Sequence, residues 1–127
     1  MKVILDTNAL MVPEQFGVEI FSELQRMGYV QFLVPVAVLA ELRTLAVKAA
    51  RGRDKVAARV GLALSERCSI VGGAGPDADT DIERLALASD LAVFTNDRAL
   101  KKRLSSKGIT VIYLRQGQYL EATKKEF

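Results

Sequence analysis

Two apolar segments of this chain, "KVIL" and "LAVF", are each followed by one aspartate, one threonine and one asparagine. These residues are Asp6, Thr7 and Asn8 after the first segment, and Thr95, Asn96 and Asp97 after the second. Either aspartate alone is explained as a turn former or a helix cap. In open α/β sheets, however, ligands bind at the carboxyl ends of the strands. We therefore expect the two triplets to meet at one binding edge.

A third acid, Glu41, lies in an apolar segment. It is the only ionisable residue from Val30 to Leu42, and on a helix its neighbours include Val38 and Leu45. A carboxylate on an apolar face is costly unless it is paired or bound to a metal. We expect Glu41 to be buried, either as a functional carboxylate or as one half of an ion pair.

The segment "ADTDIERLALASD" supplies further acids. Helical spacing places Asp79 on the same stripe as Ile82 and Ala86, whereas Asp81 lies about 200° further round the helix. This pattern predicts that Asp79 faces inward and Asp81 does not. The alternative is that Asp77 and Asp79 cap the helix and stabilise its dipole.

Asp6, Glu41, Asp79 and Asp97 together make an oxygen-only set of donors. The chain has no histidine and one cysteine, Cys68, which excludes Ser-His and Cys-His catalysis and imidazole zinc sites. Carboxylate oxygens favour Mg²⁺ or Mn²⁺ over zinc. Magnesium held by carboxylates commonly activates water and neutralises charge in phosphoryl transfer.

Basic residues are concentrated in two segments, within residues 48–67 and 98–107, although the net charge is only +3. Two basic segments beside a separate set of acids suit a polyanionic partner. Solvated helix faces are the alternative explanation. The residues expected to contact phosphates are Arg51, Arg53, Lys55, Arg98, Lys101 and Lys102.

These residues must be positioned by strands and helices, which alternate along the sequence. Strands are predicted at residues 2–6, 29–34, 69–73, 91–95 and 109–114. Helices are predicted at residues 14–28, 36–50, 54–68, 78–90 and 98–108, with a turn-rich loop over 72–79. The helix at 36–50 is apolar nearly all round, so we expect it to be buried on most sides. The alternation and the continuous apolar strands predict an α/β fold whose mostly parallel sheet is covered on both faces.

Length and composition agree with a globular protein. A chain of 127 residues, half of them hydrophobic, is the size of one domain. Asp6 interrupts the first apolar run too early for a signal peptide. The longest uncharged run, "VQFLVPVAVLA", is too short to span a bilayer and contains Pro35. A lone cysteine fits a reducing compartment, and we expect a cytoplasmic protein with no membrane partner.

Four motifs in this sequence resemble the PIN-domain metal-dependent ribonucleases. They are "VILDTNAL", "VPVAVLAEL", "DADTDIERLA", and "VFTNDRAL" followed by "GITVIYL". Their order and spacing resemble the family over nearly the whole chain. The resemblance implies a single PIN-like nuclease domain over residues 1–127, a three-layer α/β/α sandwich that is often a homodimer. It places the catalytic and metal-holding acids at Asp6, Glu41, Asp79 and Asp97, with Asn8 and Thr95 as the polar residues that hold these carboxylates. Asp81 falls where many members of the family have no acid, and we predict Asn96 and Asp81 as further supporting residues.

The resemblance also implies cleavage of single-stranded RNA with one or two Mg²⁺ or Mn²⁺ ions, leaving 5′-phosphate and 3′-hydroxyl ends. The tail "VIYLRQGQYLEA" looks more like members that process ribosomal RNA, which is the role we expect. The first alternative is the toxin of a VapBC-type toxin–antitoxin pair, with an antitoxin as partner. The second is a non-catalytic RNA-binding factor in ribosome assembly. The mutual repulsion of four acids argues against this second alternative, because it has no evident purpose without cations.

Overall fold

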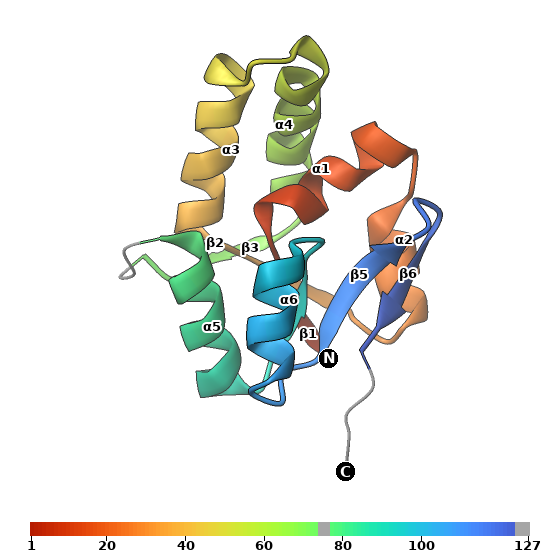
Figure 1. Cartoon of the computed structure of the whole chain (residues 1–127), viewed down its shortest axis with the longest axis vertical. Coiled ribbons are helices and arrows are strands. Elements are labelled where there is room, and N and C mark those ends of the chain that lie inside the picture. The colour runs from red at the N-terminus through yellow and green to blue at the C-terminus, as the bar shows by residue number, and fades with distance from the viewer. Residues whose placement is uncertain (74–76, 124–127) are drawn as a thin grey trace.

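The computed structural model describes residues 1–73 and 77–123, which form a six-stranded sheet and its surrounding helices (Figure 1). The strands are β1 (Lys2–Leu5), β2 (Gln31–Pro35), β3 (Ser69–Val71), β4 (Ala92–Phe94), β5 (Val111–Arg115) and β6 (Tyr119–Ala122). Their order is β3-β2-β1-β4-β5-β6, with β6 antiparallel to β5 and every other neighbouring pair parallel. The predicted mostly parallel α/β fold is confirmed.

Helices cover both faces of this sheet. In the described part of the chain they are α1 (Thr7–Phe16), α2 (Ile20–Arg26), α3 (Val36–Lys48), α4 (Gly52–Ser65), α5 (Ala78–Ser89) and α6 (Arg98–Ser105). α5 and α6 lie on one face and α2 on the other, whereas α3 and α4 project with α1 beyond the carboxyl ends of the strands (Figure 1). Within residues 1–73 and 77–123, no helix combines the length and the apolar character needed to cross a bilayer.

The strand sequences account for the sheet order. Val3, Ile4 and Leu5 of β1 are completely buried, as a strand with helices on both faces requires. β1 pairs with β2 on one side and with β4 on the other, where Ile4 is opposite Val93. The two strands that end in polar triplets are therefore neighbours at the centre of the sheet.

The helix predicted over residues 14–28 is instead two helices. α1 begins at Thr7, and Gly17 ends it in a left-handed conformation (φ 68°) with its amide donating to the Pro13 carbonyl. α2 begins only at Ile20. Glycine adopts this backbone conformation without steric cost. The chain therefore turns at Gly17, although the helical spacing of the apolar residues continues through this point. Phe16, which shares the apolar helical spacing of Ile20 and Leu24, is half exposed.

Two further features differ from the sequence-based expectation. α3 is not buried on most sides, because one face carries its buried residues, Val38, Leu39, Leu42 and Ala46, while Val47 is 69% exposed. β6 was not predicted. The expected loop over 72–79 includes residues 74–76, which lie outside the described residues.

α4 crosses α1 closely at Gly61. A Cβ atom at this position would lie 3.1 Å from the Leu10 carbonyl oxygen and 3.3 Å from the Leu42 side chain. The missing side chain therefore lets the backbones of the two helices approach.

Candidate functional site

Asp6 lies at the carboxyl end of β1 and caps α1. Its Oδ1 accepts a hydrogen bond from the Thr7 backbone amide at 2.8 Å. Its Oδ2 accepts from Thr95 Oγ1 at 2.7 Å and from Asn8 Nδ2 at 3.1 Å. The carboxylate is buried, with 5% of its residue surface exposed, so protein groups rather than water fix its orientation.

The environment of Asp6 raises its pKa from 3.8 to about 6. Burial is the main cause, and the negative charges of Asp79 and Glu41 add to it, while the hydrogen bonds from Thr95 and Thr7 oppose it. Burial disfavours the charged form of a carboxylate, and nearby like charges do the same. A cation beside Asp6 would relieve both effects.

The second triplet is joined to the first by side-chain hydrogen bonds. Thr95 is completely buried, and its Oγ1 accepts from the Asp97 amide at 3.1 Å. Asn8 Oδ1 accepts from the Asn96 amide at 2.8 Å. Asp97 Oδ1 accepts from the Leu100 amide at 3.0 Å and caps α6. The expectation that the two triplets meet at one edge is confirmed, and each aspartate is also a helix cap.

Glu41 is exposed, contrary to the expectation that it is buried. Thr7 Oγ1 donates to Glu41 Oε2 at 2.9 Å, and no described residue forms an ion pair with it. The ion-pair alternative therefore fails within the described residues. Thr7, which sequence reasoning did not assign to the site, connects Glu41 to Asp6.

The prediction for Asp79 and Asp81 is wrong with respect to burial. Asp81 is completely buried and pairs with Arg84 at 3.1 Å, whereas Asp79 is only partly buried. The pKa of Asp79 is nevertheless raised, first by burial and then by the negative charges of Asp97 and Asp77. Asp79 thus faces the other acids while Asp81 faces the interior. Asp77, not Asp79, caps α5 by accepting from the Thr80 amide at 2.8 Å.

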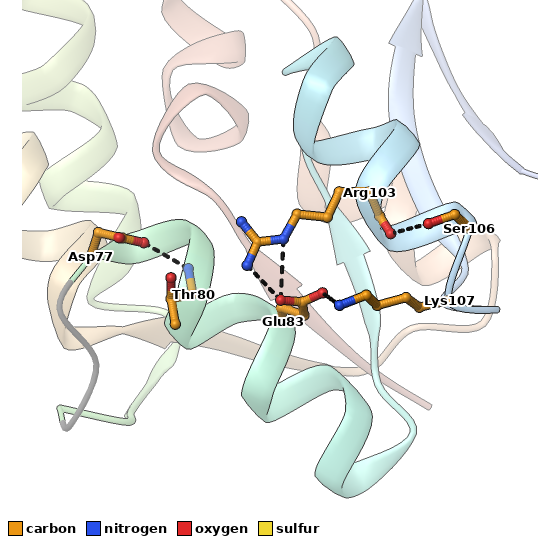
Figure 2. A network of polar contacts seen from close by, with 6 residues as sticks. All are labelled: Asp77, Thr80, Glu83, Arg103, Ser106 and Lys107. Atoms are coloured by element: carbon orange, nitrogen blue, oxygen red, sulfur yellow. Dashed lines mark hydrogen bonds and ion pairs between the residues drawn. The ribbon is translucent and has the colours of Figure 1, made fainter.

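A second ionic network joins the two helices that carry Asp79 and Asp97. Arg103 of α6 donates to Oε2 of the buried Glu83 of α5 from Nε at 3.1 Å, and Lys107 pairs with Glu83 Oε1 (Figure 2). These hydrogen bonds hold the pKa of Glu83 down at about 2. The positive charge of Arg103 also opposes the rise in the pKa of Asp79. The network fixes α5 against α6 beside the acids.

The donor chemistry of the four acids fits a hard divalent cation, because every donor is an oxygen and the negative charges of Asp79 and Glu41 both act on Asp6. As the side chains lie, no three acidic, cysteine or histidine residues of the described chain are close enough to hold one ion. Asp6 is buried and fixed. Glu41 and Asp97 are exposed, and each accepts a hydrogen bond through one carboxylate oxygen, from Thr7 Oγ1 and from the Leu100 amide respectively.

The residues predicted to contact phosphates fall into two groups. Arg51 and Arg53 are exposed at the start of α4, where Lys55 is half-buried, and Arg98 and Lys102 are exposed on α6, where Lys101 is half-buried. Lys101 Nζ lies 3.4 Å from the centre of the Tyr113 ring. Arg103, another cation of α6, forms an ion pair with Glu83.

The chain is similar in sequence to a known protein family and to two ribonucleases. The family model described as "PIN like domain" matches residues 3–117. Ribonuclease VapC9 of Archaeoglobus fulgidus is 32% identical over 113 residues, covering 89% of this chain and 82% of that protein. Ribonuclease VapC4 of Methanocaldococcus jannaschii is 28% identical over 124 residues, covering 94% of this chain and 95% of that protein.

A solved structure shares the fold. The PIN domain endonuclease Utp24 superposes with a TM-score of 0.75 at 26% identity, covering 95% of this chain and 90% of that one. The match of the family model over most of the chain and the similarity to the VapC proteins agree with the motifs and with the topology. This chain therefore belongs to the PIN-like domain family.

Proposed function

We propose that this protein is a ribonuclease that cleaves single-stranded RNA with Mg²⁺ or Mn²⁺. The observation that carries the proposal is the environment of Asp6, a buried strand-end carboxylate fixed by Thr95 and Asn8, whose pKa is raised to about 6. Perturbed carboxylates of this kind are typical of functional sites. Membership of the PIN-like family and similarity to two ribonucleases support the same activity.

Asp6, Asp79 and Asp97 are the residues that would hold the cation. When bound, it would neutralise charge on the phosphate and make water more acidic. Thr95 and Asn8 hold Oδ2 of Asp6 and the Thr7 amide holds Oδ1, so little reorganisation is needed on binding. Glu41, held through one oxygen by Thr7, has its other oxygen available to orient the attacking water and accept its proton. The new P–O bond replaces the bond to the 3′ oxygen, which takes a proton from solvent water and leaves as a hydroxyl, while Glu41 returns its proton to the solvent.

The curated relatives favour a toxin role over the ribosomal RNA processing that the tail of the sequence led us to expect. Both are named VapC ribonucleases. We therefore propose that the protein acts as the toxin of a VapBC-type pair, with an antitoxin as its partner. A purely structural RNA-binding role leaves the set of acids around Asp6 unexplained.

Cleavage is tested with single-stranded RNA in magnesium or manganese, with and without EDTA, for the parent and for Asp6→Asn. We expect cleavage by the parent only with the metal, and none by the variant. Glu66→Gln, at an exposed carboxylate where α4 ends, is the matched control and should cleave normally. Cleavage that persists in EDTA, or in Asp6→Asn, contradicts the proposed site.

The cellular role is tested by expression in a bacterial host. A toxin should arrest growth, Asp6→Asn should not, and the product of a neighbouring small gene should restore growth. Normal growth with accumulation of precursor ribosomal RNA on deletion in the native organism would instead support the processing role.

A further inference from the structure

A cationic hollow lies next to the acids, on the side of α6 and the β5–β6 turn. It has a volume of about 440 Å³, and its wall includes Asn96, the residue before Asp97. Asn96 Oδ1 accepts from the Leu114 amide at 2.8 Å, which fixes this wall to β5. We call it the Phe16 hollow, and its lining includes Phe16, Asn96, Arg98, Lys101, Tyr113, Arg115 and the turn at Gln116–Gly117.

Phe16 presents an aromatic ring at the mouth of this hollow. It is 51% exposed although it is a large apolar residue. The ring rests on the β5–β6 turn, where a Cβ at Gly117 would lie 3.3 Å from Phe16 Cδ1. Gly117 has a φ of 65° and no side chain, so the turn supports one surface of the ring. A supported and exposed ring is a platform on which a flat group can stack.

The cations of the hollow suit a phosphate. Lys101 is held over the Tyr113 ring, and the Tyr113 hydroxyl donates to Glu121 at 3.0 Å. Arg115 pairs with Glu121 at 2.7 Å, so the positive charge of Arg115 is partly neutralised. Arg98 forms no ion pair with a described residue. Arg98 and Lys101 are therefore the cations of this wall that are best placed for an anion.

A second hollow on the other side of Phe16 is less suited to a polyanion. Its lining combines Arg53 with two acids, Glu14 and Asp54. The described lining of the Phe16 hollow contains three cations and no acid. Because of this difference in charge, we expect a negatively charged RNA strand to extend from the acids into the Phe16 hollow.

We propose that the Phe16 hollow binds one unpaired nucleotide of the RNA strand beside the cleavage site, with its base stacked on Phe16 and its phosphate on Arg98 and Lys101. The proposal rests on the proposed ribonuclease function and adds a subsite to it. Aromatic stacking combined with cations is the usual way in which proteins hold unpaired nucleotides, and it accepts any base. The subsite would favour single strands, because a base inside a duplex cannot reach the ring.

The test measures binding in EDTA, so that it does not depend on cleavage. The probe is a labelled single-stranded RNA, together with a series in which one nucleotide at a time lacks its base. We expect the parent to lose roughly tenfold in affinity at one position of the series. Phe16→Ala should bind the intact RNA roughly tenfold more weakly than the parent does. Its affinity should not fall further when the base at that position is missing, whereas Phe16→Trp should bind as the parent does.

Leu87→Ala is the control, since Leu87 is 53% exposed on α5 and lies outside the hollow; it should bind as the parent does. The proposal is overturned if Phe16→Ala binds intact RNA normally, or if it remains sensitive to the missing base. Normal RNA binding with lost binding of an acidic protein partner would assign the hollow to that partner and also overturn it. Cleavage of RNA by the parent in magnesium, measured separately, decides the proposed function whatever the result at Phe16.

Discussion

Thr95 Oγ1 lies 2.7 Å from Asp6 Oδ2 and 3.1 Å from the Asp97 backbone nitrogen. A hydroxyl has one proton to donate, and here the partners determine its direction, because the Asp97 amide can only donate and the Asp6 carboxylate accepts. One buried hydroxyl thus connects an acid after β1 to an acid after β4. The spacing of the two carboxylates depends on a neutral residue.

Thr95→Val should therefore weaken both the site and the fold. The substitution leaves Asp6 Oδ2 and the Asp97 amide each short of a hydrogen bond, which costs roughly 1–3 kcal/mol of unfolding free energy. Cleavage should fall more steeply, because Asp6 loses its orientation. Chemical denaturation and cleavage rates measure the two effects. Thr110→Val, just before β5, is the control and should cleave normally; equal loss in both variants would contradict this role for Thr95.

Asp6→Asn should stabilise the protein when no divalent cation is present. The folded-state pKa of Asp6 is about 6, above its ordinary value of 3.8, so ionisation of Asp6 at pH 7.5 costs stability that the neutral amide does not. The amide must also turn its NH₂ group toward one of the three groups that donate to Asp6, which offsets part of this gain, so we expect a net gain of about 1 kcal/mol in EDTA. Magnesium should stabilise the parent and not the variant. Thermal melts in EDTA and in magnesium test this, and a large loss of stability in EDTA would contradict it.

Glu41→Gln should abolish or strongly reduce cleavage without changing stability. The residue is exposed, and its hydrogen bond from Thr7 survives because the amide oxygen can accept it. Exposed substitutions without special contacts usually change stability by less than about 0.5 kcal/mol. Cleavage rates and melting temperature distinguish the two effects. A drop of several degrees in melting temperature would indicate that Glu41 supports the fold.

Asp79→Asn and Asp81→Asn should differ in activity. Asp79 faces the acids and is affected by the charge of Asp97, so its neutral variant should cleave at least a hundredfold more slowly, roughly the loss of one strong electrostatic contribution. Asp81 is buried against Arg84 and faces the interior, so its variant should keep most of its activity. The reverse order in single-turnover assays would place Asp81 in the site.

Glu83→Gln should destabilise the protein in a pH-dependent way. The pKa of Glu83 is held at about 2, below its ordinary 4.5, so its charge stabilises the fold above pH 4.5 and this contribution disappears as the pH falls towards 2. The melting temperatures of parent and variant should therefore differ at pH 7 and converge below pH 3. Glu23→Gln, which breaks the exposed pair with Arg26, is the control and should show little difference at either pH.

Much of the fold was predictable from the sequence because its strands are continuous apolar runs. Buried parallel strands need such runs, and β1 and β4 have them. The capping positions were also visible, since Pro35 precedes α3 and Asp97 precedes α6. The meeting of the two polar triplets followed from the rule that parallel strands present their carboxyl ends at one edge.

The errors have a common physical origin, because periodicity along a chain does not show what covers each face. The apolar spacing that includes Phe16 and Ile20 is interrupted by the left-handed Gly17. Apolar residues surround Glu41 in the sequence, yet Glu41 itself is exposed beside the buried Val38. Asp79 and Asp81 occupy different faces of α5, and packing of α5 against its neighbours, not spacing, decided which one was buried.

The central position of β1 has a consequence for synthesis of the protein. β1 is made before the other strands of the sheet, but one of its two neighbours, β4, begins only at residue 92. Thr95 and Asp97, which complete the surroundings of Asp6, emerge from the ribosome after β2 and β3. Contacts between segments so distant in sequence form late in folding. A nascent chain that stops short of residue 97 therefore carries Asp6 and Glu41 but no assembled site, so truncated products are expected to be harmless to the RNA around them.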